Sequence, residues 1–562
     1  MTPLIQRIWK YRLHYLIVLP ALMLLLIFKG IPLVEMTYSA FVDYKVIDSI
    51  WGSKWVGLAN FRVLFDNPAF ETVVRNTLIM KLGYTLACGI AAFVAALALS
   101  CIRSHRYRSG LAALFLAPYF LPSLLFAYMV MVILSPAQSP FGGIHTLVLA
   151  RPDLFRSLFI SLEVIKTSGI TIMLALATIG ATQSAMVKGL VPNRTSFFSR
   201  HVLPALQAIG AFMLMQLSSV LTQDTELLRM LVNPLVFESG DALGSYSYRL
   251  VFENFELNLA GPLGLFELLI QLAGTLLAYA VIRRTFAKTL FAAGSGSDSA
   301  PSNVIQPKPR YNAAGIVIGT MLALVAAFVL YMFFVYPFTA KHAEGPGLES
   351  LLSMRNYMRY MAIDLAAVIP FMLITVTLAF PLTVKDLPGR GLYKFVLLIL
   401  LVMGSGTFYE FLFYKDLHML NTVFPLFISG IFSILPVFIL KSIASSRMTL
   451  QEDVEGKGEL HKFFYVYLPS CWQPLLALGA LQFVMQWNSV TLPTIIMSNP
   501  SKFPPLQQFM IAMHSGAGTK AAYSPAVLLQ FGAIILLPSL IVLLVFRKWL
   551  TAAVLTSQIR NL

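Results

Sequence analysis

Residues 289–309 read TLFAAGSGSDSAPSNVIQPKP and divide the 562-residue chain into two parts. Gly, Ser and Pro dominate this stretch, which is the composition of a flexible linker. Apolar segments long enough to cross a bilayer lie on both sides of it, six before and six after. The sequence therefore predicts two modules, a first half (residues 1–288) and a second half (residues 310–562).

The composition excludes the common classes of soluble protein. Hydrophobic residues make up 58% of the chain and charged residues only 12%, whereas a soluble protein is about 45–50% apolar and about 25% charged. The three cysteines have no CxxC spacing, so neither a zinc site nor a disulfide framework is indicated. We expect an all-α polytopic membrane protein with no metal and no cofactor.

The predicted fold is a pair of six-helix halves, about twelve transmembrane helices in all. Each span needs about 20 mostly apolar residues. The first apolar run is too long for a signal peptide and has no small-residue cleavage site, so we expect it to be a retained helix. The predicted spans are 14–34, 77–101, 110–134, 157–182, 205–222 and 262–283 in the first half, and 314–338, 360–384, 392–413, 420–440, 474–498 and 523–546 in the second.

The net charge of +16 follows the predicted topology. Lys and Arg are in excess over Asp and Glu in the loops that share a side with the N-terminus, and such loops are cytoplasmic in most membrane proteins. Both termini and the linker are therefore expected on the cytoplasmic side of the cell membrane. The basic charge does not indicate a nucleic-acid partner.

A short motif occurs once in each half. FFSRHVLP (197–204) precedes the fifth predicted span, and FFYVYLP (463–469) precedes the eleventh. A single proline at a helix start is common, because its missing N–H has no partner there in any case. Two Leu-Pro pairs at equivalent places indicate a duplicated module.

Several stretches resemble one known family. In the first half these are WGSKWVGLANF (51–61), Asn67-Pro68, Arg75-Asn76-Thr77, NPLVFESGD (233–241), Tyr248-Arg249 and Glu253-Asn254; in the second they are KDLPGRG (385–391), QWNS (486–489) and FPPLQ (503–507). The chain resembles the membrane subunits of binding-protein-dependent carbohydrate ABC importers, particularly those for oligosaccharides and polysaccharide fragments. In that family the two subunits are usually separate chains, so this chain resembles a fusion of both.

The resemblance implies a function and partners. A permease of this kind translocates an oligosaccharide-like solute that an external binding protein delivers, and separate ATP-binding cassette subunits drive it from the cytoplasmic face. The chain has no Gly-x-x-x-x-Gly-Lys-Ser/Thr loop, so ATP hydrolysis is expected on another subunit. Two alternatives remain open: an ion-coupled secondary carrier, and a non-transporting sensor or assembly partner derived from such a permease.

The resemblance also marks the cytoplasmic loops that would dock on the ATPase. In the family, an Asp-Gly lies about thirteen residues before the Leu-Pro. Glu455-Gly456 is a fair substitute at that place in the second half, whereas Leu190-Val191 stands there in the first. Because valine resists turns that glycine allows, the two loops should dock unequally. The candidate coupling residues are Val191, Arg194, Pro204, Glu455, Gly456 and Pro469.

Polar residues inside the spans indicate a solute pathway. Such residues are costly in lipid and usually face the bundle interior or a wet path. Gln482 and Gln486 are four apart and share one helix face, and their amides both donate and accept hydrogen bonds. Hydrogen bonding between helices is the alternative role. The candidate pathway residues are Gln216, Gln482, Gln486, Trp487 and Asn488.

Six ionisable residues also lie inside predicted spans. Glu163 and Lys166 are three residues apart on one helix, so we expect them to neutralise each other. Glu267 and Glu410 have no obvious partner in the sequence, and an ion-coupled carrier would use such carboxylates. The full set is Lys81, Glu163, Lys166, Glu267, Asp364 and Glu410.

Overall fold

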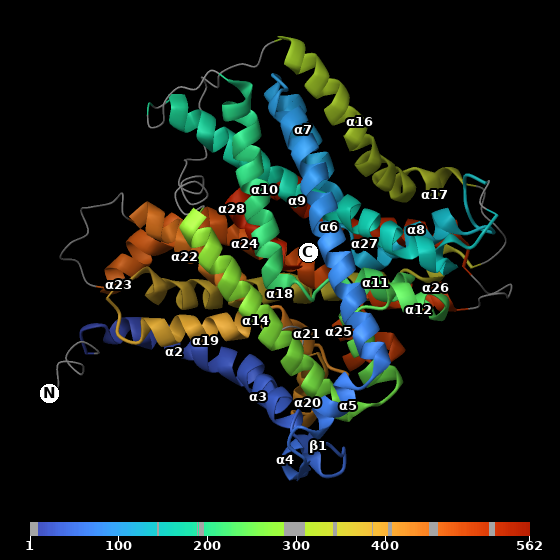
Figure 1. The fold of residues 1–562 in the computed structure, drawn as a ribbon, viewed down its shortest axis with the longest axis vertical. Helices are drawn as coiled ribbons and strands as arrows, with labels where there is room; N and C mark the ends of the chain where they lie inside the picture. Colours follow the sequence, from blue (N-terminus) through green and yellow to red (C-terminus); the bar gives the residue numbers. More distant parts are fainter. Residues whose placement is uncertain are drawn as a thin grey trace.

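The computed structural model is almost entirely helical (Figure 1). Within the described residues, the exception is a two-residue antiparallel ladder between β1 (Val42–Asp43) and β2 (Lys54–Trp55). The described residues are 9–142, 145–187, 189, 196–285, 309–340, 346–384, 386–402, 407–448, 459–515 and 523–561.

Nine helical segments of the described chain are long and apolar enough to cross a membrane, or eleven if two sharply bent pairs are each counted as one span. Many large apolar side chains on these helices point outward, among them Leu276, Met321 and Ile541. An apolar exterior suits the hydrocarbon of a bilayer, and the protein is a multi-pass membrane protein. The straight spans are Arg12–Ser39, Pro68–Ser100, Pro152–Val187, Phe198–Ser219, Leu257–Ile282, Tyr311–Phe334, Met354–Thr383, Lys462–Asn488 and Pro525–Phe546.

Each of these spans corresponds to one or more labelled helices. The first contains α2 (Arg12–Leu25), the π-helical turn η1 (Leu26–Gly30) and α3 (Ile31–Ser39). The others are formed mainly by α6 (Pro68–Ser100), α9 (Pro152–Val187), α10 (Leu203–Gln216), α14 (Ala260–Thr285), α16 (Pro309–Phe334), α18 (Met354–Ala379), α24 (Leu468–Asn488) and α27 (Pro525–Phe546).

Short helices connect the spans or form their ends. They are α4 (Ser49–Gly52), α5 (Ala59–Phe65), η3 (Val148–Ala150), η5 (Leu217–Ser219), α11 (Thr225–Leu231), η6 (Pro234–Val236), α12 (Phe237–Gly240), α13 (Leu243–Tyr248), η7 (Arg249–Glu253), η8 (Leu257–Leu259), α17 (Tyr336–Thr339), η9 (Leu348–Ser350), η10 (Phe380–Thr383), α23 (Glu459–His461), α25 (Thr491–Ile496), η13 (Pro500–Lys502), α26 (Pro505–His514), α28 (Ala552–Leu555) and η14 (Thr556–Asn561).

Two predicted spans are bent rather than straight. The chain turns by 93° between α7–η2 (His105–Phe120) and α8 (Ser123–Leu134), and by 100° between α19 (Arg390–Val402) and α20 (Thr407–Asp416). At the first bend, Pro122 directly precedes α8. Proline cannot donate a backbone hydrogen bond and so breaks a helix there. At both places the apolar stretch is long enough for a span, as the sequence predicts. The number of apolar residues does not show whether the helix axis changes direction.

The predicted span 420–440 is wrong as a single helix. The chain instead forms α21 (Phe424–Ser429), a break, and then α22 (Leu435–Met448). Pro425 lies in the first turn of the first of these helices and Pro436 in the first turn of the second, with Gly430 between them. Two prolines at helix starts and a glycine at a helix end interrupt an otherwise apolar run.

Both Leu-Pro pairs begin an α-helical segment, as the sequence predicts. A π-helical turn precedes each of them, η4 (Phe198–Val202) before α10 and η12 (Lys462–Tyr467) before α24. The eleventh span therefore begins earlier than predicted and contains Pro474 inside α24. The two halves share this local structure as well as the sequence motif.

The first helix of each half packs on the opposite half. α2 packs against α18 and α3 against α20, while α16 packs along α6 and α7 (Figure 1). The His14 ring stacks on Phe380 with ring centroids 4.7 Å apart. In the reciprocal contact, Tyr107 and Thr320 share a hydrogen bond of 2.7 Å between their side-chain oxygens. The two halves are thus interlocked through their first helices.

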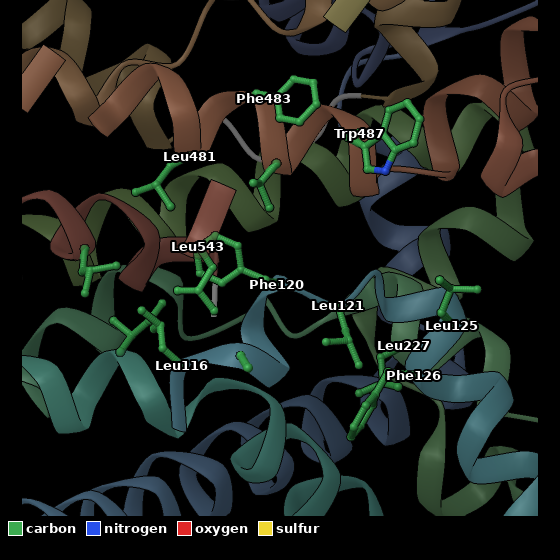
Figure 2. Close-up of a cluster of buried hydrophobic side chains, with 14 of the residues drawn as sticks. Leu116, Phe120, Leu121, Leu125, Phe126, Leu227, Leu481, Phe483, Trp487 and Leu543 are labelled. Atoms are coloured by element: carbon green, nitrogen blue, oxygen red, sulfur yellow. The ribbon is translucent and has the colours of Figure 1, made fainter. Parts of the chain in front are cut away.

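The hydrophobic core crosses from one half to the other without a break. Burial of apolar surface is the main favourable term in such packing of extramembrane parts, and close packing is the main one within lipid. Figure 2 draws side chains of one buried cluster from both halves: Leu116, Phe120, Leu121, Leu125, Phe126 and Leu227 of the first, and Leu481, Phe483, Trp487 and Leu543 of the second.

Candidate functional site

A cavity of about 690 Å³ lies between the two halves. This volume is within the range of pockets that bind small molecules, about 300–1,000 Å³. The first half contributes mainly the segment that follows α10, and the second contributes the end of α24 and the segment after it. The polar residues of these two segments on the cavity are Gln223, Asp224, Thr225, Glu226 and Arg229, and Gln482, Gln486, Asn488, Ser489 and Thr491.

Four of the five predicted pathway residues come together at this cavity. Gln482, Gln486, Trp487 and Asn488 occupy the last turns of α24 and line it. Gln216 is not among the described residues around the cavity. It is buried, and its Oε1 accepts a hydrogen bond of 3.1 Å from the Ser219 hydroxyl. That these residues contact a solute stays a prediction.

The Gln486 side chain is held from two sides. Its Nε2 donates to the carbonyl of Leu426 at 2.9 Å, and the amide also donates to the carboxylate of Asp364. The amide rests against Gly430, where an added Cβ would lie only 1.9 Å from Gln486 Oε1. A glycine is required at this close approach.

The next two residues of α24 are fixed by neighbouring helices. Trp487 Nε1 donates to the carbonyl of Ile535 on α27 at 2.8 Å. Asn488 Nδ2 donates to the carbonyl of Phe120 in the first half at 3.0 Å, and its Oδ1 accepts from Ser539 at 2.9 Å. The end of α24 is therefore tied both to its own half and to the bend before α8.

Aromatic rings and amides both line the cavity. An aromatic face offers a flat apolar surface, and an amide offers a donor and an acceptor. A ligand that combines ring C–H groups with hydroxyls would find both kinds of partner here. The aromatic residues include Tyr119, Tyr248 and Phe252 from the first half and Tyr360, Tyr409 and Trp487 from the second.

The expected pairing of Glu163 with Lys166 is wrong. Lys166 forms an ion pair with Asp224 and donates to Ser123, both of which lie outside its own helix. The main charged neighbour of Glu163 is Lys81 on α6. Spacing along one helix brought the two groups near each other, but tertiary packing supplied each of them with a different partner.

Asp224 is held ionised by its surroundings. Burial alone raises the pKa of this carboxyl, but the Lys166 ammonium, the Leu227 N–H and the Ser123 hydroxyl together hold the pKa below its ordinary value. Its Oδ1 accepts from the Leu227 N–H at 2.9 Å, which caps the start of α11. The first half thus presents a fixed negative charge paired with a fixed positive one.

Glu226 joins the first half to the second across the cavity. Its Oε1 accepts hydrogen bonds from the backbone N–H groups of Val490 at 2.9 Å and Thr491 at 3.0 Å, and from the Thr491 hydroxyl at 3.0 Å. These N–H groups are at the start of α25, where a negative charge is favoured. Nearby, the Arg229 guanidinium lies 3.2 Å from the centre of the Tyr248 ring.

Sequence reasoning missed Gln223, Asp224, Glu226 and Arg229, because they lie beyond the predicted fifth span. The spacing from the Leu-Pro pairs could have indicated Gln223. Gln223 follows Pro204 by 19 residues, and Asn488 follows Pro469 by the same 19. Both amides line the cavity.

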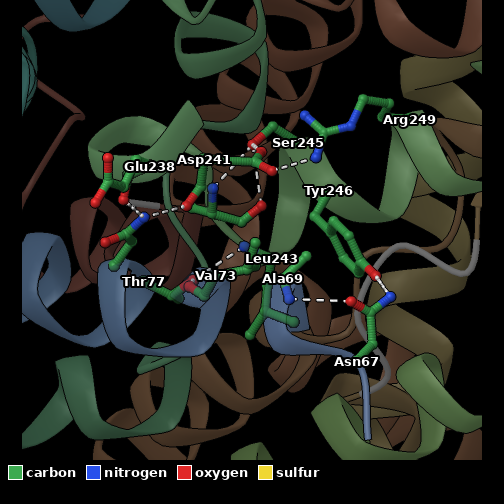
Figure 3. Close-up of polar contacts among 12 residues, drawn as sticks. Asn67, Ala69, Val73, Thr77, Glu238, Asp241, Leu243, Ser245, Tyr246 and Arg249 are labelled. Carbon is green, nitrogen blue, oxygen red and sulfur yellow. Dashed lines mark hydrogen bonds and ion pairs between the residues drawn. The ribbon is translucent and has the colours of Figure 1, made fainter. Parts of the chain in front are cut away.

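Two of the stretches that carry the family resemblance contact each other (Figure 3). The Thr77 Oγ1 accepts from the Leu243 N–H at 2.9 Å, and the Asn76 amide donates to the carbonyl of Asp241 at 3.1 Å. The Asp241 carboxylate accepts from Ser245 at 2.7 Å and pairs with Arg249. The segment 233–254 is therefore fastened to the first turns of α6, beside the cavity.

Of the predicted coupling residues, only the two prolines are described. Pro204 is buried in the first turn of α10, whereas Pro469 is exposed in the first turn of α24. Val191, Arg194, Glu455 and Gly456 lie outside the described residues.

Two curated proteins of Bacillus subtilis (strain 168) are similar to the chain. Protein LplB is 25% identical over 264 residues, which covers 45% of this chain and 83% of LplB. The polygalacturonan/rhamnogalacturonan transport system permease protein YteP is 24% identical over 291 residues, covering 49% of this chain and 89% of YteP. About half of this chain is similar to a transport-system permease. No family model matches the chain.

Solved structures give a match of similar extent. A bacterial alginate ABC transporter, in complex with an alginate pentasaccharide-bound periplasmic protein, has 24% identity and a TM-score of 0.43 over 50% of this chain and 96% of the matched chain. A second structure, of a bacterial ABC transporter involved in import of the acidic polysaccharide alginate, has 24% identity and a TM-score of 0.44 over 50% of this chain and 98% of its own.

Proposed function

We propose that this protein is the permease of a binding-protein-dependent carbohydrate ABC importer. The similarity to YteP along 89% of that protein carries this proposal, and a cavity lined by amides and aromatic rings supports a carbohydrate as the solute. The chain is the transport component and is not itself an ATPase. ATP-binding cassette subunits on the cytoplasmic face drive transport, and an external solute-binding protein delivers the oligosaccharide.

The chain is further proposed to be a fusion of two permease subunits, residues 1–288 and 310–562, joined by the linker 289–309. Each relative matches over most of its own length but over only about half of this chain. The reciprocal packing of α2–α3 and α16, and the repeated π-turn before a Leu-Pro helix, support two related halves. In a twelve-element pseudo-dimer of this kind, α21 and α22 together form one broken element.

Within this permease, Gln482, Gln486, Trp487 and Asn488 form the wall of the solute pathway. The loops before Pro204 and Pro469 transmit the force of ATP hydrolysis to α10 and α24. Because α24 reaches the cavity and the segment that follows α10 lines it, a displacement of either loop would be carried to the pathway.

Reconstituted transport tests the function. The full chain, purified with its ATP-binding subunits and binding protein into liposomes, should accumulate a labelled neutral tetrasaccharide such as β-1,4-mannotetraose only when ATP is hydrolysed. The matched control is the Walker-lysine variant of the ATPase. Uptake that persists without ATP and collapses with the proton gradient would establish the secondary carrier, and absence of flux in every condition would establish the sensor.

Cysteine labelling tests the orientation. The native cysteines Cys88, Cys101 and Cys471 are all buried, so a single added thiol gives a clean signal. We expect Ser302→Cys to react with a membrane-impermeant maleimide only after the cells are opened, because the linker is cytoplasmic. Labelling in intact cells would reverse the proposed topology.

A further inference from the structure

Among the described residues, the cavity is lined by more acidic than basic side chains. Five carboxyl groups and three cationic groups of this part of the chain line it. A bound solute interacts mainly with charged groups that have no partner within the protein. The existing ion pairs therefore decide which charged groups are available to the solute. The acidic residues are Asp224, Glu226, Glu267, Asp364 and Glu410, and the basic ones are Lys29, Lys166 and Arg229.

Each cation already has a partner within the protein. Lys29 Nζ lies 2.5 Å from Glu410 Oε1, and Lys166 pairs with Asp224. The Arg229 guanidinium stacks on the Tyr248 ring and lies beside Glu226. A cationic group that is stacked and flanked by a carboxylate is poorly placed to bind a further anion.

Two carboxyl groups remain after these pairs are formed. Asp364 on α18 accepts a hydrogen bond from the neutral amide of Gln486 but forms no ion pair with a described residue. Glu267 on α14 forms neither an ion pair nor a hydrogen bond with any residue in the described part of the chain. Both face the cavity, from different halves.

We propose that this cavity selects oligosaccharides without negative charge, neutral sugars or amino sugars, and rejects uronates. The inference rests on the proposed carbohydrate permease function. Proteins usually bind sugar carboxylates with arginine or lysine, and Arg forms two parallel hydrogen bonds to them. Here each described cation of the cavity already has a partner, so the carboxylate of a uronate would be buried beside carboxyl groups with no positive charge to compensate it. The selectivity differs from that stated in the name of YteP, a polygalacturonan/rhamnogalacturonan permease.

Matched tetrasaccharides test the inference on the purified full chain. β-1,4-Mannotetraose and β-1,4-tetramannuronate differ only in a hydroxymethyl or carboxylate group on each ring, and cellotetraose and the glucosamine tetramer differ only in a hydroxyl or ammonium group. By titration calorimetry, the mannuronate should bind at least tenfold more weakly than mannotetraose. The glucosamine tetramer should bind at least as tightly as cellotetraose.

Two near-isosteric variants connect this selectivity to the named residues. Asp364→Asn and Glu267→Gln should each reduce the mannotetraose-to-mannuronate affinity ratio at least threefold, while mannotetraose binding shows that the variant is folded. The control Glu349→Gln removes an exposed carboxylate outside the cavity and should leave the ratio unchanged.

The outcomes separate the inference from the function on which it rests. Mannuronate binding as tight as mannotetraose binding, or an affinity ratio that neither variant changes, overturns the charge selectivity alone. Failure of all four sugars to bind the wild-type chain overturns the carbohydrate site itself, and the selectivity with it.

Discussion

The helices α10 and α24 begin alike and end differently. Both follow a π-helical turn, and both start with Leu-Pro. α24 continues for 21 residues and brings Gln482, Gln486 and Trp487 to the cavity, whereas α10 ends after 14 residues at Gln216. A repeat in sequence can therefore preserve how a helix begins without preserving what its far end does.

The equal spacing from the Leu-Pro pairs extends beyond the residue where α10 ends. Gln223 and Asn488 lie at the same distance from their prolines, although one is in a connecting segment and the other ends a helix. Each donates to a backbone carbonyl of the first half, Gln223 to Thr77 at 2.9 Å and Asn488 to Phe120 at 3.0 Å. At this equivalent position the first half thus lines the cavity with a residue of a connecting segment and the second half with the last residue of a helix.

The largest expected effect comes from breaking the ion pair between Lys166 and Asp224, which holds the segment between α10 and α11 in place. Lys166→Met leaves Asp224 charged and almost buried without its partner, which costs about 3–5 kcal/mol of unfolding free energy for a pair of this kind. Chemical unfolding in detergent measures the loss. The control Arg151→Gln breaks the exposed pair with Asp153 and should leave stability unchanged, since exposed pairs contribute little.

The same variant has a pH signature. The pKa of Asp224 lies below its ordinary value in the folded protein, so its stabilisation is complete above the unfolded pKa of about 3.9 and is lost as the pH falls through the folded value. Lys166→Met should flatten this acid-side dependence. Stability and pH profile equal to those of the wild type would mean that the pair does not hold the loop.

A smaller effect should separate the two glutamines. Gln486→Leu removes a donor to Leu426 and Asp364 from the cavity wall, and we expect uptake to fall about tenfold, as for the loss of about 1.4 kcal/mol of hydrogen bonding. Gln216→Leu should leave uptake within about twofold, because this buried side chain lies away from the cavity and its hydrogen bond to Ser219 is not part of the cavity wall. Membrane abundance is measured for both. Equal losses of uptake in the two variants would contradict the expectation that the amide of α24 matters more for transport than the amide of α10.

The smallest effect should come from moving Gln486 without removing it. In Gly430→Ala the new Cβ would come within 1.9 Å of Gln486 Oε1, so the amide must shift, and uptake should fall a few-fold. Gly391→Ala is the matched control, because nothing lies within 4 Å of its added Cβ. Wild-type uptake by the Gly430 variant would show that the exact position of the amide is unimportant for transport.

The sequence predicted the membrane class and most spans because crossing lipid imposes a length of apolar chain that is visible residue by residue. It predicted the start of both Leu-Pro helices because proline acts locally. It did not predict the bend at Pro122 or the break at Gly430, since an apolar count does not distinguish a straight run from two short helices that diverge.

The sequence by itself determined that this chain is a multi-pass helical membrane protein with a duplicated motif and an amide-rich eleventh span. Only the tertiary structure decided that Gln486 lines a cavity while Gln216 does not, that Lys166 pairs with Asp224 rather than Glu163, and that Glu226 caps a helix of the other half. Helix periodicity relates residues a few positions apart, whereas these contacts join segments that the packing of the two halves brings together. The partner of a buried charge is set by that packing, because the nearest opposite charge in space need not be the nearest in sequence.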